Sequence, residues 1–206
     1  MTYLELIRLY DLEEIWGAMM LRPTVKRLVH IAGVIETAYE LAQIYGADSR
    51  NAVVAAVFHD WYRGGEEREL NKLIGVYGLD EYYKGKANLS HGLLAAELMR
   101  ERYGVADEDL LNAVRYHTTG RAGMSLLEKI MFMADVIEPS RVYEGVDELR
   151  RLAFEDLDAA MIRALRATID YVRMKGESLD DSTLQAYNFL VPYGQTTQLN
   201  NKNSGV

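Results

Sequence analysis

The stretch that decides the fold is residues 30–60, which read HIAGVIETAYELAQIYGADSRNAVVAAVFHD. Apolar residues recur three or four positions apart between Ile31 and Tyr45, and this is the period of an amphipathic helix. Gly46 can end that helix, and Asp48 can cap the next one. The second helix, over residues 51–60, is rich in Ala and Val and therefore apolar on most sides. Two consecutive helices, one of them buried, form the centre of the predicted fold.

Helical patterns continue outside this stretch. They predict helices over residues 66–76, 91–103, 107–117, 126–137, 146–175 (with one break) and 182–190. Ser90 is expected to cap the helix over residues 91–103, and Ser125 with Glu128 has the spacing of a capping box. No repeat and no convincing strand is found, so the predicted fold class is all-α. We expect an N-terminal helical extension over residues 1–11, one domain over residues 12–193 and a disordered tail over residues 194–206.

Composition narrows the classes of function. The chain has 206 residues and a net charge of −8, which argues against a nucleic-acid-binding protein. It has no cysteine, so disulfides and thiolate metal sites are excluded. The first residues do not resemble a signal peptide, and no uncharged apolar run reaches the roughly 18 residues of a membrane-spanning helix. We therefore expect a cytoplasmic protein that binds neither nucleic acid nor membrane.

Residues that can bind metal are few and occur in or near apolar helices. The four histidines of the chain are His30, His59, His91 and His117. Asp60 follows His59 directly, and Asp135 lies in an apolar helix where an unpaired carboxylate is costly. A single buried histidine is more often a core residue than a ligand, and a His-Asp pair alone is weak evidence. Together, imidazole and carboxylate groups on helices that can converge indicate a divalent-metal site.

Several segments of the chain resemble one known family. The order His30, His59-Asp60, Asp135 resembles the HD-domain metal-dependent phosphohydrolases. Residues 88–92 (NLSHG), 115–121 (RYHTTGR) and 134–141 (ADVIEPSR) further resemble the YqeK family of symmetrical bis(5′-nucleosyl)-tetraphosphatases within that superfamily. The resemblance implies that residues 12–193 form an HD-domain helical bundle with the metal site between helices.

The same resemblance implies the residues of the site. It implies one or two divalent metal ions of the iron type, held by His30, His59, Asp60 and Asp135. The catalytic residues would be Asp60, His91 and His117. The residues that bind substrate would be Arg27, Arg63, Gly64, Gly65, Glu66, His91, His117, Thr118, Arg141 and Thr183.

The implied reaction is the hydrolysis of diadenosine tetraphosphate to two ADP. The partners would then be a dinucleoside polyphosphate or ADP, with a homodimer as a further expectation. Gly64, Asp180 and Tyr187 depart from the family pattern and leave two alternatives open. One is another HD-type hydrolase that acts on a nucleoside monophosphate or a guanosine alarmone, and the other is a nucleotide-binding protein without turnover.

Overall fold

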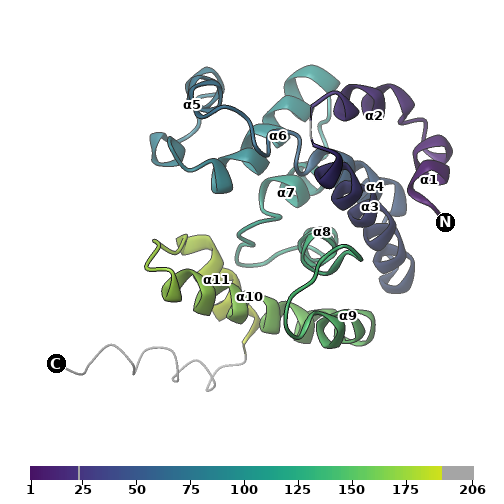
Figure 1. The fold of residues 1–206 in the computed structure, drawn as a ribbon, viewed down its shortest axis with the longest axis vertical. Coiled ribbons are helices and arrows are strands. Elements are labelled where there is room, and N and C mark those ends of the chain that lie inside the picture. The colour runs from purple at the N-terminus through teal and green to yellow at the C-terminus, as the bar shows by residue number, and fades with distance from the viewer. Residues whose placement is uncertain (23, 192–206) are drawn as a thin grey trace.

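The computed structural model describes residues 1–22 and 24–191, and in this part it confirms the all-α prediction (Figure 1). Eleven α-helices and one short 3-10 helix form the described part, which contains no strand. The helices are α1 (Tyr3–Leu9), α2 (Glu13–Met20), α3 (Val25–Tyr45), α4 (Ser49–Phe58), α5 (Glu67–Val76), η1 (Glu81–Tyr83), α6 (Ala87–Tyr103), α7 (Glu108–Arg115), α8 (Leu126–Ile137), α9 (Val146–Glu155), α10 (Leu157–Met174) and α11 (Asp181–Leu190).

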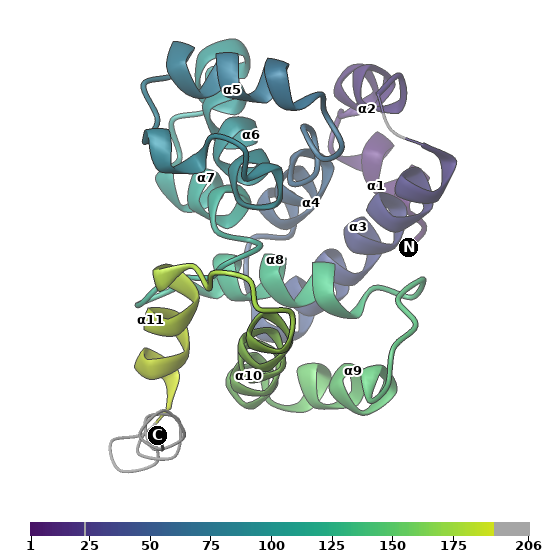
Figure 2. The ribbon, with the colours of Figure 1, turned by 60° about the vertical axis from the view of Figure 1, so that its left-hand side comes forward.

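Helix α8 lies in the middle of the molecule. It contacts α3, α4 and α7 on one side and α9 and α10 on the other, as Figures 1 and 2 show. Residues 130–134 of α8 and residues 52–58 of α4 are all buried. A helix that is apolar on nearly all sides is stable only inside a protein, so α4 and α8 form the core on which the other helices pack.

The ends of two helices fix where the histidines lie. Helix α4 was expected to reach Asp60 but ends at Phe58, and α7 was expected to reach His117 but ends at Arg115. His59, Asp60 and His117 therefore lie in the turns that follow these helices. Both differences are two residues, the usual uncertainty of a helix end.

The start of α6 corrects one prediction. The helix begins at Ala87, not at His91, so the expectation that Ser90 caps it is wrong. The Ser90 amide donates to the Lys86 carbonyl at 2.9 Å, which places Ser90 inside the first turn. The sequence Ala87-Asn88-Leu89 carries no breaker, and the chain can extend the helix back to Lys86. His91 consequently lies one turn inside the helix.

Other expectations have mixed outcomes. The break within residues 146–175 is confirmed at Asp156, whose side chain caps α10. Helix α2 was not expected. The domain limits at residues 12 and 193 stay predictions, and residues 192–206, which include the predicted tail, lie outside the described residues.

Among the described helices, none has both the length and the apolar character needed to cross a membrane.

The capping box of α8 is confirmed and gives a stability prediction. The Ser125 side chain accepts a hydrogen bond from the Glu128 amide at 3.1 Å, and the Glu128 side chain accepts one from the Ser125 amide. Because an N-cap side chain satisfies a backbone donor that the helix leaves free, Ser125→Ala should lower the free energy of unfolding by about 1 kcal/mol. Urea denaturation followed by circular dichroism measures this.

Ser182→Ala is the matched control, since Ser182 lies in the first turn of α11 but Asp180 supplies the cap there. This control should stay within about 0.5 kcal/mol of the wild type. Equal stabilities of the two variants would show that the capping box does not stabilise α8.

Candidate metal centre

The Asp60 carboxylate lies at the centre of the four histidines. Its Oδ2 atom is 3.7 Å from His30 Nε2 and 3.8 Å from His59 Nε2. Its Oδ1 atom is 3.3 Å from His91 Nε2 and 4.0 Å from His117 Nε2. The structure therefore brings together two groups of potential ligands, His30/His59/Asp60 and Asp60/His91/His117, which share Asp60.

The spacing of these groups suits metal ligands. The Nε2 atoms of His30 and His59 are 3.4 Å apart, and those of His91 and His117 are 3.0 Å apart. Asp135 joins the first group, with Oδ1 3.1 Å from His30 Nε2. Adjacent ligands of one ion with bonds of about 2.1 Å lie about 3.0–3.4 Å apart in tetrahedral or octahedral geometry. The donor set thus fits a divalent metal.

The outer nitrogen of each ring fixes its orientation. Nδ1 of His59 lies 2.7 Å from the Ala56 carbonyl oxygen, that of His117 lies 2.7 Å from Val114, and that of His91 lies 3.1 Å from Ala87. A carbonyl oxygen can only accept, so Nδ1 carries the proton in these three rings. In the neutral form each ring then directs the lone pair of Nε2 towards Asp60, as a metal ligand must.

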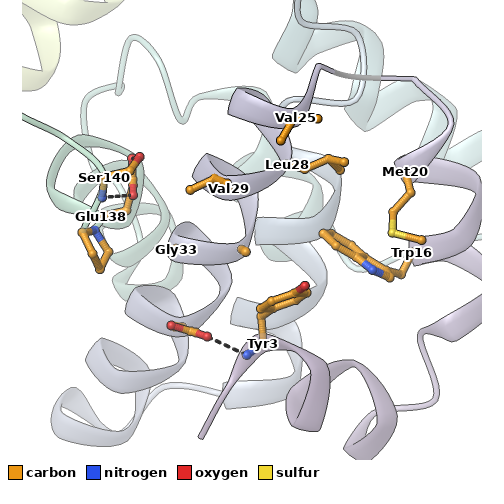
Figure 3. A pocket seen from close by; sticks show the side chains of 12 residues that line it. Tyr3, Trp16, Met20, Val25, Leu28, Val29, Gly33, Glu138 and Ser140 are labelled. Atoms are coloured by element: carbon orange, nitrogen blue, oxygen red, sulfur yellow. Dashed lines mark hydrogen bonds between the residues drawn. The ribbon is translucent and has the colours of Figure 1, made fainter.

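His30 is oriented by a carboxylate instead of a carbonyl. Its Nδ1 lies 3.0 Å from Glu138 Oε1. The amide of Ser140 donates to Glu138 Oε2 at 2.6 Å, as Figure 3 shows. The Ser140 hydroxyl donates to Oε1 at 2.6 Å. Such a carboxylate–histidine pair is the usual support of a metal-binding imidazole. Sequence reasoning missed this role of Glu138, although the residue lies in a segment that carried the family resemblance.

Two glycines allow the close approach of these groups. A Cβ atom at Gly33 would lie 2.6 Å from Glu138 Oε2. A Cβ atom at Gly92 would lie 2.8 Å from the Val114 carbonyl oxygen and 3.0 Å from the His117 ring. Any larger residue at either position would displace a ring or its support.

At neutral pH the two aspartates of the cluster are ionised, and most of its histidines are neutral. Burial alone would raise the pKa of Asp60, but the neighbouring His59 and His91 hold that pKa far below its usual range. Burial would also raise the pKa of Asp135, but its hydrogen bond with His30 holds that pKa well below its usual range. Burial lowers the pKa of His59 and His91, and it lowers that of His117 to about 4.

His30 differs from the other rings. Burial opposes its charged form, but hydrogen bonds to Asp135 and Glu138 outweigh burial and raise its pKa to about 9. In the metal-free protein a proton on Nε2 of His30 therefore sits where a metal ion would bind. The ionised carboxylates make the first group a site that favours positive charge, and in the absence of a metal ion the protonated ring supplies part of that charge.

Arginines from three segments surround the carboxylates. The Arg27 guanidinium pairs with Asp60, and Arg141 Nη2 lies 2.5 Å from Asp135 Oδ1. Arg63, in the turn after α4, is partly buried, and burial lowers its pKa. The guanidinium fork is suited to phosphate oxygens, so these three residues can hold a polyphosphate beside the cluster.

Several residues that were predicted to bind substrate line two cavities. The first, of about 600 Å³, is called the His30 cavity and is lined by Lys26, Arg27, His30, Glu138, Ser140, Arg141, Val142 and Tyr143. The second, of about 580 Å³, is called the Thr118 cavity, and its lining includes Arg63, Thr118, Tyr171 and Thr183. Gly64 and Gly65 line a smaller cavity of about 180 Å³ instead. Glu66 is exposed at the start of α5 and lines neither the His30 cavity nor the Thr118 cavity.

Comparison with known proteins gives a family. Residues 27–140 match the model of the HD domain. The chain is similar to the protein named symmetrical bis(5′-nucleosyl)-tetraphosphatase of Bacillus subtilis, with 39% identity over 180 residues, 87% of this chain and 97% of that protein. It is 43% identical to the protein of the same name from Halalkalibacterium halodurans, over 82% of this chain and 90% of that one.

A solved structure is also similar. It is the crystal structure of a protein from Clostridium acetobutylicum described as a predicted HD superfamily hydrolase involved in NAD metabolism. The TM-score is 0.82 and the identity 39%, with 86% of this chain and 95% of that chain covered. The likeness therefore extends over most of the fold.

The support of His30 gives a prediction for metal affinity. Glu138→Gln keeps the shape of the side chain but removes its charge, so His30 becomes a weaker and less well oriented ligand. The affinity for a divalent ion should fall about 10- to 100-fold. Titration with Mn²⁺ followed by electron paramagnetic resonance measures it. Glu148→Gln on α9 is the control, since Glu148 is exposed and pairs with Arg163. Equal affinities of the two variants would exclude a supporting role for Glu138.

The pKa of His30 predicts how metal binding depends on pH. Below a pKa of about 9, His30 is protonated in the metal-free protein, and an ion that binds Nε2 must displace that proton. Affinity should therefore rise about tenfold per pH unit from pH 6 to 8 and level off above pH 9. Calorimetry in buffers of different ionisation enthalpy should find about one proton released per ion. Affinity that is flat from pH 6 to 8 would contradict the assignment of His30 as a ligand.

Proposed function

Because the chain belongs to the HD-domain family, and within it to the group of the symmetrical bis(5′-nucleosyl)-tetraphosphatases, we propose that it hydrolyses diadenosine tetraphosphate to two ADP. One observation carries this proposal: His30 of the cluster lines one cavity together with Arg27 and Arg141, and a second cavity contains Arg63 and Thr118, whose hydroxyl lies 3.2 Å from His117 Nε2. A substrate with four phosphates between two nucleosides can bring its central bridge to the cluster and extend an end to either side. A nucleoside monophosphate would leave one side unused.

The cluster supports a centre with two metal positions. His30, His59, Asp60 and Asp135 would hold one ion, and Asp60, His91 and His117 would hold the other, with Asp60 shared. Four imidazoles and two carboxylates without any thiolate suit iron, which we propose as the metal. When bound, the metal supplies Lewis acidity and lowers the pKa of water towards neutrality.

The protonation states of the chain's own groups support specific roles. Asp60 is ionised at neutral pH, so it can accept a hydrogen bond from the attacking water and orient it. Burial keeps His117 neutral, with a pKa of about 4, so it is a poor proton donor at pH 7. We therefore assign His91 and His117 to ligation instead of acid catalysis.

The arginines support the departure of the product. ADP leaves as an anion and needs charge stabilisation more than a proton. Arg27 and Arg141 line the His30 cavity, and Arg63 lines the Thr118 cavity, so each ADP half would meet at least one guanidinium. Attack at either inner phosphorus gives the same two products. A homodimer and a cytoplasmic location stay predictions.

Product analysis tests the reaction. The protein loaded with Fe²⁺ or Mn²⁺ should convert diadenosine tetraphosphate to ADP alone, because the central bridge lies at the cluster. Anion-exchange chromatography separates ADP from ATP and AMP. Equal amounts of ATP and AMP would contradict cleavage at the central bridge. Rapid hydrolysis of AMP or of a guanosine alarmone, without turnover of the dinucleotide, would replace this function by the alternative one.

Variants of the cluster are the controls for that reaction. His59→Ala and Asp60→Ala should each reduce turnover to below about one thousandth, because both groups are needed to hold and use the metal. Asp158→Ala changes an exposed aspartate of α10 and should keep full turnover. A variant of the cluster that keeps turnover would show that the activity arises elsewhere.

A further inference from the structure

Each of the two cavities has a lining residue that belongs to the cluster or contacts it. His30 lines the His30 cavity and lies near the Oδ2 atom of Asp60, at 3.7 Å. Thr118 lines the Thr118 cavity, and its hydroxyl lies 3.2 Å from Nε2 of His117, which itself is 4.0 Å from the Oδ1 atom of Asp60. The two cavities therefore adjoin different histidines of the cluster, which lie near different oxygen atoms of Asp60.

The His30 cavity is built for a polyphosphate near the cluster. Arg27 and Arg141 each pair with a carboxylate of the cluster and also line the cavity, and Lys26 adds an exposed ammonium group. The acidic residue in the lining, Glu138, is buried and already engaged by His30 and Ser140. The lining of the His30 cavity thus carries more positive than negative side chains.

Farther along the lining, the cavity offers apolar surface. Val142 is 92% exposed and Tyr143 is 43% exposed. The Tyr143 hydroxyl donates to the Val136 carbonyl oxygen at 3.0 Å, which fixes the ring at the end of α8. The Thr118 cavity contains a comparable residue, Tyr171, which is 56% exposed. Each cavity therefore combines arginine beside the cluster with one accessible tyrosine.

We propose that the His30 cavity binds the second nucleoside of the dinucleotide, with its base stacked on Tyr143, while the first nucleoside occupies the Thr118 cavity. This inference rests on the proposed function, and it identifies Tyr143 as a residue that determines specificity for two-ended substrates. Stacking on an aromatic ring accepts any base, since each base has a π-face. The cavity thus selects for a second nucleoside without selecting strongly for adenine.

Binding of a non-hydrolysable substrate tests the assignment without turnover. The probe is diadenosine tetraphosphate with a methylene group in place of the central bridging oxygen, and its dissociation constant is measured by calorimetry on the metal-loaded protein. Tyr143→Ala should weaken binding of this probe about tenfold, because one stacked base is lost. ADP has one nucleoside and keeps the unchanged Thr118 cavity when the His30 cavity loses its ring, so its overall affinity should fall by no more than about twofold.

Two further variants separate stacking from folding. Tyr143→Phe keeps the ring and loses only the hydroxyl, so it should bind the probe nearly as well as the wild type. Val142→Asp adds a negative charge at a highly exposed position, where folding is unaffected, and should weaken binding of the probe more than that of ADP. Thermal unfolding of each variant verifies that it is folded.

The outcomes distinguish this inference from the proposed function. Unchanged binding of the probe by both Tyr143→Ala and Val142→Asp would overturn the inference. Equal losses for the probe and for ADP would also overturn it, because Tyr143 would then not be specific to the second nucleoside. Weaker binding of the probe alone, in a protein that does not hydrolyse diadenosine tetraphosphate, would support the inference and reject the proposed reaction.

Discussion

The buried carboxylate of Asp60 is surrounded by the Nε2 atoms of four imidazole rings. Hydrogen bonds from the rest of the structure hold these rings in place. An ionised carboxylate inside a protein is unfavourable unless positive charge compensates it. Arg27 provides one such charge, and the proton on His30 provides another. A divalent ion on either side of Asp60 would satisfy the same requirement more completely. The cluster is therefore electrostatically prepared for cations before any ion binds.

The backbone is shaped to keep these rings close. Helices α4 and α7 end just before His59 and His117, and the carbonyls of their last turns accept from the Nδ1 atoms of these two residues. The missing side chains of Gly33 and Gly92 leave room for Glu138 and for the His117 ring. Helix termini, outer hydrogen bonds and two glycines thus act together, which explains how four histidines can share one carboxylate.

The sequence predicted the parts of the site that metal chemistry restricts. Few residue types bind a divalent ion, so the four histidines, Asp60 and Asp135 were candidates in a chain without cysteine, and the family resemblance implied His30, His59, Asp60 and Asp135 as the ligands of one ion. The central helices could be predicted as well, because α3 has a clear period and α4 is apolar from Ala52 to Phe58. The capping box of α8 followed from two residues at fixed spacing.

Other features carry no local signal. Glu138 acts through His30, a residue 108 positions away, and only the folded chain brings the two together. The start of α6 was missed because Ser90 is a good cap by type, whereas burial decided its place inside the helix. Tyr143 is one of 14 tyrosines, and its exposure beside the cluster depends on the loop between α8 and α9.

The central claim is that Asp60 is shared by two metal positions. Crystals of the metal-loaded protein, measured at the absorption edge of iron or manganese, give the positions of the ions from anomalous difference maps. Two peaks are predicted, one bounded by His30, His59 and Asp135 and the other by His91 and His117, with Asp60 in contact with both. Peaks that do not contact Asp60, or a fully active protein with no peak in either group, would contradict this account.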